Sequence, residues 1–354
     1  MALTLTSVTD PALRGYDAII DVRSPAEYAE DHLPGAISLP VLDDDERARV
    51  GTIYKQQSPF LARKIGAALV ARNAARHLEG PLSGFGGGWR PLVYCWRGGQ
   101  RSGSFATILA QVGWRTELVA GGYKAWRGLV VSALHAAPVA APVVVLDGNT
   151  GTAKTEILGH LAAAGHQVID LEGLANHRGS VFGHRAGGQP SQKAFEGRLA
   201  AAIEALDPAR PVLVEAESSR IGALSLPSRL WAAMAAAPRV RIAAPLAARA
   251  DYLARAYGDL SADRVRLATV IEALRPSHAR EVIDDWLALA AAGDFAALAG
   301  GLMERHYDPR YARHRARFED RSEAVVAADD LAPAALPGLA DRVAAAAARL
   351  VRGG

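Results

Sequence analysis

Short apolar runs recur along the chain and alternate with longer stretches in which apolar and polar residues are mixed. Runs this short, separated by stretches long enough for a crossover helix, are typical of parallel β-strands. The pattern therefore predicts an α/β fold with two parallel sheets, one in each half of the chain. The expected strands are 17–21, 36–38, 92–95 and 116–119 in the first half, and 143–147, 167–170, 212–215 and 240–243 in the second.

A short Ala/Pro stretch at 136–142 separates the two halves, and the apolar pattern restarts directly after it. We place the boundary near residue 138, which gives a first domain at 1–138 and a second at 139–354. A chain of 354 residues is long enough for two domains, each with its own core. Two Ala/Leu/Arg-rich stretches, 247–302 and 333–351, predict a helical C-terminal region.

Composition narrows the class of protein. Half of the residues are apolar, yet no uninterrupted apolar stretch reaches about 18 residues and the first residues lack a basic region, so we expect neither a membrane span nor a signal peptide. The single cysteine excludes an internal disulfide and suits a reducing cytoplasm. The net charge of +3 permits an anionic partner without requiring one.

That cysteine, Cys95, ends an apolar run and opens a loop with the sequence Cys-Trp-Arg-Gly-Gly-Gln-Arg-Ser. A glycine-rich turn that leads into a helix directs backbone N–H groups at one point, and Arg97 and Arg101 add positive charge. These features favour the thiolate, which is the nucleophilic form. The alternative is a buried cysteine that acts as a small apolar side chain.

The run at 143–147 continues into Gly-Asn-Thr-Gly-Thr-Ala-Lys-Thr, which is close to a P-loop. In such a loop the backbone amides surround a phosphate, and the candidate phosphate-binding residues are Gly148, Gly151, Lys154 and Thr155. Ala153 stands where the pattern has glycine; a positive φ there would cost on the order of 1–2 kcal/mol. The alternative is an ordinary strand-to-helix turn.

Polar residues follow the next two strands of the second half. Glu172, His177, Arg178 and Ser180 lie after the second strand, and Glu215, Glu217 and Arg220 follow the third. A loop this rich in polar groups is more often functional than decorative, and since ligands collect at the carboxyl ends of parallel strands we expect Glu215 and Glu217 near the P-loop. One of the carboxylates at 215 and 217 is a candidate to hold Mg²⁺ through water or to act as a base. Solvated loops would explain the same residues.

The stretch 305–317 carries five arginines, two tyrosines and a single acid. Guanidinium groups pair with phosphate and aromatic rings stack on unpaired bases, so this composition suits RNA. An arginine-rich surface helix is the alternative. The candidate tRNA-binding residues are Arg305, Tyr307, Arg310, Tyr311 and Arg313.

Three segments of the first half, in order, resemble the rhodanese family of sulfur-transfer domains. They are Asp-Val-Arg-Ser-Pro-Ala-Glu-Tyr from Asp21, the cysteine loop, and Gly-Gly-Tyr-Lys-Ala-Trp from Gly121. The resemblance covers roughly residues 1–135 and implies that Cys95 is the catalytic cysteine. The spacing Cys-x5-Arg is one residue longer than in the usual rhodanese loop, which suggests a phosphate-sized anion.

The rhodanese-like half, the P-loop and the motifs around them together resemble the bacterial tRNA 2-selenouridine synthase family, nearly end to end. The resemblance implies a cytoplasmic enzyme that converts 2-thiouridine to 2-selenouridine at the wobble position, in the anticodon region of tRNA. It implies S-geranylation from geranyl diphosphate and then replacement of the geranylthio group by selenium from selenophosphate. By analogy the P-loop would bind the diphosphate, and the Cys95 loop would hold selenophosphate or carry a perselenide. No tightly bound cofactor is then expected.

Two other interpretations of the sequence stay open. A sulfurtransferase fused to an ATP-dependent small-molecule kinase would also combine these two loops, and it would turn over ATP without RNA. A non-catalytic module that binds tRNA or another anion would account for Ala153 as a sign of a decayed P-loop.

Overall fold

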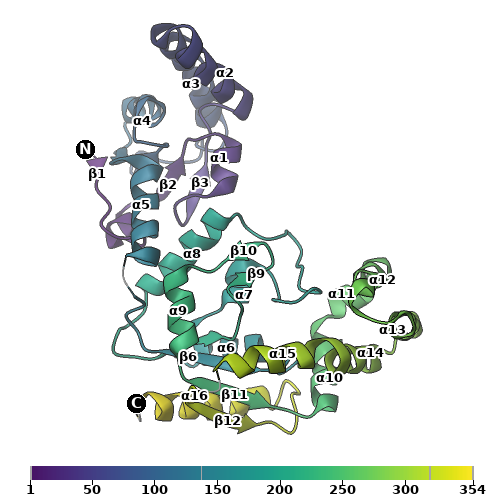
Figure 1. Ribbon diagram of the computed structural model, residues 1–354. Helices are drawn as coiled ribbons and strands as arrows, with labels where there is room; N and C mark the ends of the chain where they lie inside the picture. Colours follow the sequence, from purple (N-terminus) through teal and green to yellow (C-terminus); the bar gives the residue numbers. More distant parts are fainter. Residues whose placement is uncertain (1, 137, 319, 353–354) are drawn as a thin grey trace. The chain divides into compact units, whose positions relative to one another are not determined.

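The chain divides into two compact units, which we describe one at a time (Figure 1). The computed structural model describes residues 2–136, 138–318 and 320–352. The first unit comprises 1–137 and 190–205, and the second comprises 138–189 and 206–354.

One segment groups differently from the predicted domains. The division after residue 137 lies beside the predicted boundary at 138, whereas residues 190–205 make their contacts within the first unit. The domain limits 1–138 and 139–354 stay a prediction.

The first unit is built on a five-stranded parallel sheet with the strand order β1-β5-β4-β2-β3. The four predicted strands are confirmed, and β1 is an added edge strand that the sequence did not indicate. The strand before Cys95 is central and fully buried, which explains its unbroken apolar sequence. The strands are β1 (Ala2–Leu3), β2 (Ala18–Asp21), β3 (Ala36–Ser38), β4 (Pro91–Tyr94) and β5 (Glu117–Val119).

Helices α4 and α5 pack on this sheet, and α8, from the segment 190–205, packs on α5. On α8, Gly197 leaves room for the ring of Trp126 on α5, because a Cβ at residue 197 would lie 3.0 Å from Cη2 of that ring. Arg127 on α5 also pairs with Glu196 on α8. The helices are the 3₁₀ turn η1 (Pro11–Gly15), α1 (Pro25–Glu30), α2 (Asp44–Gln56), α3 (Pro59–Glu79), α4 (Gln100–Val112), α5 (Gly122–His135) and α8 (Gln192–Glu204).

The second unit has its own five-stranded parallel sheet, in the order β12-β11-β6-β8-β7. The four predicted strands are confirmed, and β12 is an edge strand that the sequence analysis missed. A short antiparallel pair, β9 (Arg220–Ile221) with β10 (Leu224–Ser225), follows the third strand. The strands of the sheet are β6 (Val143–Gly148), β7 (Gln167–Ile169), β8 (Val212–Glu215), β11 (Arg239–Ala243) and β12 (Glu323–Ala327).

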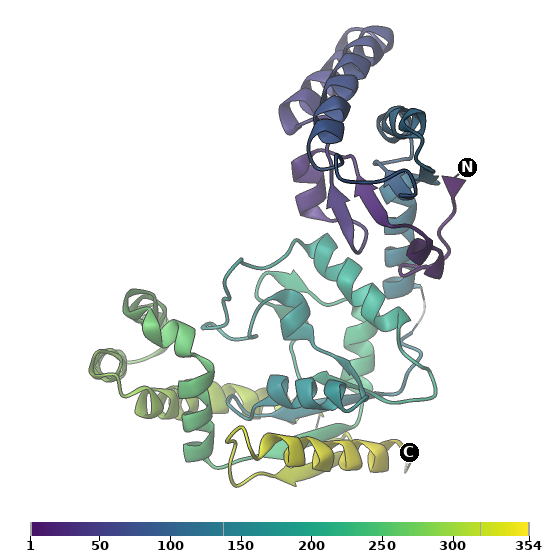
Figure 2. The same ribbon diagram turned by 180° about the vertical axis from the view of Figure 1, so that it is seen from behind.

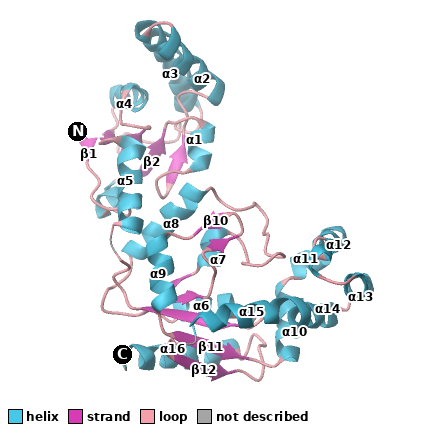
Figure 3. Cartoon of the chain, in the orientation of Figure 1, coloured by secondary structure: helices cyan, strands magenta, loops and turns pink. Residues whose placement is uncertain are grey.

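Two helices, α6 (Lys154–Ala163) and α16 (Leu336–Arg352), lie side by side on this sheet and share one apolar core with it (Figure 2). The predicted helical region is confirmed: α10 to α14 gather at one side of the sheet (Figure 3). Helices α11 to α14 share a second apolar core, and α10 packs against α14. A π-helical turn at Met303–Tyr307 joins α14 to α15.

Within the described residues, no helix combines the length and the apolar composition that crossing a membrane requires. The other helices of the second unit are α7 (Leu171–Ala175), α9 (Ser228–Ala236), α10 (Leu246–Ala256), α11 (Gly258–Ala262), α12 (Arg264–Glu272), α13 (Arg280–Ala292), α14 (Phe295–Leu302) and α15 (Asp308–Arg315), with 3₁₀ turns at Arg275–Ser277 and Ala316–Phe318.

Candidate active site

The cysteine loop starts at the carboxyl end of the central strand β4 and ends where α4 begins. The Cys95 side chain is buried, and its Sγ accepts a hydrogen bond of 3.1 Å from the Ser102 hydroxyl. Ser102 belongs to the first turn of α4 and is itself fully buried. The sequence analysis did not single out this serine, although it lies within the loop motif.

The start of α5 fixes the backbone of this loop. The N–H of Tyr123 donates to the Cys95 carbonyl, and the N–H of Lys124 donates to the Trp96 carbonyl, both at 2.9 Å. Gly122 has a φ of +58°, and a Cβ there would collide with the Cys95 carbonyl oxygen. The Gly-Gly-Tyr motif is therefore needed for this close approach of two backbone segments.

The two arginines of the loop lie in different surroundings. Arg97 is exposed, whereas Arg101 forms an ion pair of 2.7 Å with Glu27 on α1. Burial raises the pKa of Glu27, but the hydrogen bond and charge of Arg101 outweigh it and lower that pKa to about 2. Arg47 also pairs with Glu27, at 3.0 Å. The carboxylate therefore stays ionised and holds the Arg101 side chain, which projects from α4, against α1.

The P-loop joins β6 to α6, as the sequence predicts. Gly148 and Gly151 have φ values of +152° and +84°, and Ala153 adopts a left-handed φ of +58°. The Lys154 ammonium donates to the Gly148 carbonyl at 2.9 Å, and the Thr155 hydroxyl donates to a Glu172 carboxylate oxygen at 2.9 Å. Ala153 therefore has the positive φ that is costly for a residue with a Cβ.

Buried arginines brace the P-loop from behind. Arg249 on α10 pairs with Asp308 at 2.8 Å and donates to the Thr150 carbonyl at 3.2 Å. Arg239 on β11 pairs with Asp147 at 3.1 Å. None of these residues was a candidate from the sequence, because their partners lie 59 to 99 positions away along the chain.

Three glutamates gather between the P-loop and the strand end of β8. Glu215 is fully buried; its Oε1 accepts the Glu172 N–H at 2.6 Å, and its Oε2 has no hydrogen-bond partner among the residues that the structure describes. Burial raises the pKa of Glu215 well above its usual range, and the nearby Glu172 adds to this shift. Burial and the hydrogen-bonded Glu172 also raise the pKa of Glu217 to about 8, against the lowering charge of Lys154.

Three pockets open around these groups, and each is named here by its lining. The P-loop pocket, of about 260 Å³, is lined by Thr150 to Glu156, Glu172, Arg178, Ser180, Arg185, Tyr252, Leu253, Ala256, Tyr257 and Tyr311. The carboxylate pocket, of about 330 Å³, is lined by Thr150, Gly179, Ser180, Val181, Ala216, Glu217, Ser218, Tyr307, Arg310 and Tyr311.

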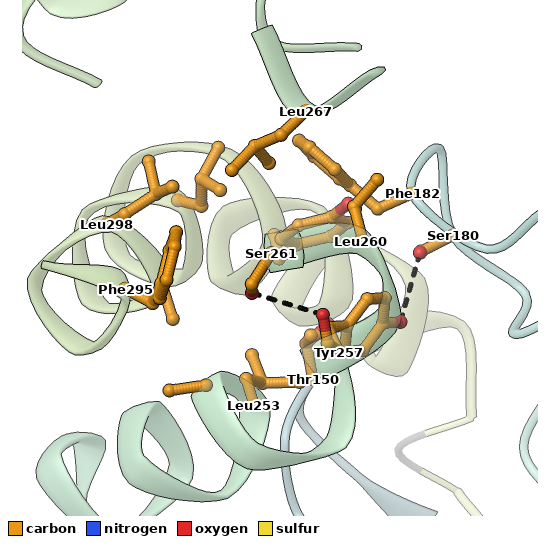
Figure 4. Close-up of a pocket in the computed structure, with 14 residues that line it drawn as sticks. Thr150, Ser180, Phe182, Leu253, Tyr257, Leu260, Ser261, Leu267, Phe295 and Leu298 are labelled. Carbon is orange, nitrogen blue, oxygen red and sulfur yellow. Dashed lines mark hydrogen bonds between the residues drawn. The ribbon is translucent and has the colours of Figure 1, made fainter. Parts of the chain in front are cut away.

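The third cavity, the apolar pocket, is narrower, about 70 Å³, and lies against the helical core (Figure 4). Leucine and phenylalanine side chains converge on it, and a hydrogen bond of 3.4 Å between Ser180 and Tyr257 closes its polar end. Its lining residues are Thr150, Ser180, Phe182, Leu253, Ala254, Tyr257, Leu260, Ser261, Leu267, Phe295, Leu298, Ala299, Leu302 and Tyr307.

The residues predicted after the second strand take up different positions. Ser180 lines all three pockets, and Arg178 lines the P-loop pocket while pairing with Asp259 at 2.9 Å. His177 is buried and accepts the Gly179 N–H at Nδ1, so it shapes the loop, and it is outside the three linings described above. Burial lowers its pKa, which favours the neutral ring.

The arginine-rich stretch divides in the same way. Tyr307, Arg310 and Tyr311 line the carboxylate pocket, whereas Arg305 and Arg313 are exposed and belong to none of the three linings. Arg220, on β9, is also exposed and outside them. The structure thus brings part of the predicted RNA-binding segment to the P-loop.

This arrangement can bind an anion at one unit's cysteine loop and, in the other unit, an amphiphilic phosphorylated molecule. Backbone amides, Lys154 and a helix N-terminus receive the phosphate end, and an adjacent apolar cavity receives the other. Among the described residues, no group of three or more His, Cys, Asp or Glu is arranged to hold a metal ion.

The architecture is that of a rhodanese-like domain joined to a P-loop domain. Residues 9–129 match the rhodanese-like domain family, and residues 141–272 match the family described as tRNA 2-selenouridine synthase AAA domain. The tRNA 2-selenouridine synthase of Hahella chejuensis is 35% identical over 330 residues, with 83% of this chain and 84% of that protein covered. The chain belongs to the tRNA 2-selenouridine synthase family.

Other comparisons agree with this assignment. The tRNA 2-selenouridine synthase of Nitrosomonas europaea is 33% identical over 323 residues, which cover 86% of this chain and 82% of that protein. The protein of that name from Alcanivorax borkumensis is 35% identical over 325 residues, covering 83% and 88%. The chain is therefore an enzyme that transfers selenium to tRNA.

Proposed function

We propose that the chain makes 2-selenouridine in two steps, S-geranylation of 2-thiouridine by geranyl diphosphate followed by selenation with selenophosphate. The observation that carries the first step is the contact between a phosphate-binding loop and an apolar cavity. The P-loop pocket and the apolar pocket share Thr150, Ser180, Leu253 and Tyr257.

A prenyl diphosphate has the matching two-part chemistry. Its diphosphate suits the P-loop amides and Lys154, which stabilise the charge that develops as the diphosphate leaves. Its hydrocarbon chain suits the apolar pocket, since burial of apolar surface contributes about 25 cal/mol per Å². The Thr155 hydroxyl and the carboxylate of Glu172, 2.9 Å apart, are oxygen ligands of the kind Mg²⁺ prefers; a bound ion would neutralise diphosphate charge.

The second step belongs to the cysteine loop. A selenium nucleophile attacks C2 of the alkylated base and geranylthiolate leaves, because alkylation turns the thiocarbonyl sulfur into a good leaving group. The α4 N-terminus, the loop amides and Arg97 suit the selenophosphate anion, and we assign Cys95 to positioning it. The selenium forms its bond to C2 as the C2–S bond breaks, and water then cleaves the Se–P bond and releases phosphate.

The substrate is a 2-thiouridine in the anticodon region of tRNA, and a tRNA substrate makes the cytoplasm the expected location. Tyr307, Arg310 and Tyr311 are the residues we assign to the RNA. The alternative of an ATP-dependent kinase is less well supported, because an apolar cavity next to the P-loop does not suit a second polar substrate.

Nucleoside analysis tests the proposal directly. Purified protein is incubated with 2-thiouridine-containing tRNA and geranyl diphosphate, with and without selenophosphate, and the tRNA is digested for mass spectrometry. We expect a geranylated nucleoside without selenophosphate and a selenonucleoside with it. Consumption of ATP or thiosulfate with neither nucleoside formed would instead favour the fused sulfurtransferase and kinase.

A further inference from the structure

A fourth pocket lies within the first unit, between the helices α2 and α3 and the start of α4. This hairpin pocket has a volume of about 260 Å³, and its walls include the apolar side chains of Leu42, Val50, Ala62 and Val70. Helix α2 packs on α3, and α3 packs on α4. No step of the proposed function uses this cavity so far.

The hairpin pocket adjoins the cysteine loop. Gln100 and Arg101 line it, and both belong to the loop sequence that begins at Cys95. Leu42 and Val70, which also line it, belong to the same apolar cluster as Cys95. A ligand whose polar part lies at the loop can therefore extend an apolar part into this pocket.

Two ion pairs fix the walls of the pocket beside the loop. Glu27 on α1 pairs with Arg101 on α4 at 2.7 Å and with Arg47 on α2 at 3.0 Å. One carboxylate thus ties α2 to the start of α4, and both helices contribute to the lining. The pocket therefore has a defined position next to the cysteine loop.

We propose that the hairpin pocket holds the prenyl chain of the S-geranylated base while selenium replaces the geranylthio group. The inference rests on the proposed function. The chain stays on the sulfur until the C2–S bond breaks, when geranylthiolate leaves with the electron pair of that bond. It must therefore accompany the base to the cysteine loop, whereas the apolar pocket assigned to the donor lies in the second unit.

The chemistry of the lining suits a hydrocarbon. Aliphatic side chains and the ring of Tyr54, which is 55% exposed at the pocket, offer apolar surface, with few polar groups among them. Of the two arginines in the lining, Arg101 is paired with Glu27 and Arg63 is exposed to solvent, so a phosphate fits less well. A bound chain would make the cysteine loop select the alkylated base over 2-thiouridine.

The first test measures selenation alone, on an anticodon stem-loop that already carries the alkyl group. S-geranyl-2-thiouridine is compared with S-allyl-2-thiouridine, because both release an allylic thiolate and differ in chain length. Burial of one CH₂ group favours binding by about fourfold, so burial of only three further carbons gives about 50-fold. With selenophosphate we expect kcat/KM of the wild type to be at least about 50-fold higher for the geranyl stem-loop.

The second test changes the pocket from two sides. Ala67→Trp fills it from α3 and should lower kcat/KM for the geranyl stem-loop by about tenfold or more, mainly through KM, with much less effect on the allyl stem-loop. Ala68→Trp, at the next exposed position of α3 and outside the lining, is the matched control. Tyr54→Ser removes part of the apolar wall and should also lower the preference, whereas Phe60→Ser, exposed and outside the lining, should not.

The outcomes separate this inference from the proposed function. Wild-type protein that selenates neither stem-loop overturns the proposed selenation itself. Equal kcat/KM for the two stem-loops, or a geranyl preference that both Ala67→Trp and Tyr54→Ser retain in full, overturns only the assignment of the hairpin pocket. A variant that loses the allyl reaction as well is damaged in its fold, and the other variant then decides.

Discussion

Individual residues divide the proposed chemistry between the two loops. The Cys95 thiol is buried beside the Ser102 hydroxyl, in the first turn of α4, so solvent does not reach it freely. The P-loop residues, by contrast, face cavities that continue into an apolar core. A single substitution in one loop should therefore abolish the step assigned to that loop and leave the other step intact.

We expect Cys95→Ala to abolish selenation and to let geranylated tRNA accumulate, because the P-loop and its pockets do not contain this residue. Nucleoside mass spectrometry measures both products in one reaction. Ser102→Ala keeps the thiol and should retain more selenation than Cys95→Ala. A folded Cys95→Ala protein that loses geranylation as well would contradict the division of labour.

Ala153 is the one departure from the P-loop pattern, and its energetics nearly cancel. A left-handed φ costs on the order of 1–2 kcal/mol for a residue with a Cβ, so Ala153→Gly removes that strain. The change also gives the unfolded chain more conformational freedom, which destabilises the fold by about 0.5–1 kcal/mol. The loss of a buried methyl group destabilises it by about a further 0.8 kcal/mol.

The free energy of unfolding of Ala153→Gly should therefore lie within about 1 kcal/mol of the wild type, with geranylation unchanged. Urea unfolding measures the difference. Ala153→Val should be clearly destabilising, since a β-branched residue tolerates this φ poorly. A large gain in stability or activity for the glycine variant would show that the methyl group distorts the loop.

At the scale of elements, the strand end of β8 and the short helix α7 place three carboxylates together in a buried setting. A carboxyl whose pKa is raised in the folded state binds its proton more tightly there than in the unfolded chain. Its contribution to stability is full below the unfolded pKa near 4.5 and is lost as the pH rises through the folded pKa, about 8 for Glu217.

We therefore expect the free energy of unfolding to fall between pH 6.5 and 8.5, by up to about 1.4 kcal/mol per pH unit for each such proton. Thermal unfolding across this range measures the slope. Glu217→Gln should reduce it, leaving the share of Glu215, and Glu304→Gln should not. Histidines with lowered pKa act in the opposite direction but below about pH 6.5. An unchanged slope in Glu217→Gln would contradict the raised pKa.

The sequence predicts the strands of both sheets because buried parallel strands read as short unbroken apolar runs. It misses β1, which is only two residues long, and β12, since Glu323–Ala327 has a single buried residue and its partner β11 lies 84 positions earlier in the chain (Arg239 pairs with Glu323). The P-loop and the cysteine loop are local motifs, so they were predictable. The apolar pocket was not, because separate segments from Thr150 to Tyr307 line it.

At the scale of the whole molecule, the two sites lie in different compact units with separate sheets. Geranylated tRNA is a complete, closed-shell molecule, so nothing in its chemistry ties it to the chain that made it. In the proposed two-step reaction, one chain can then alkylate a tRNA and another can selenate it.

We accordingly expect a mixture of Cys95→Ala and Lys154→Ala chains to convert 2-thiouridine tRNA to 2-selenouridine tRNA, although neither variant does so alone. Lys154→Ala removes the ammonium that neutralises the diphosphate, and it leaves the cysteine loop unchanged. Mass spectrometry of the mixture at several protein concentrations measures the product. The control is the double variant with both substitutions, mixed with either single variant. With Cys95→Ala it should not selenate, and with Lys154→Ala it should not geranylate, so neither mixture should form 2-selenouridine. The opposite outcome is 2-selenouridine with the wild-type chain but none with the mixture. It would mean that the geranylated base stays on the chain that made it, so that each cysteine loop acts only on its own chain's intermediate.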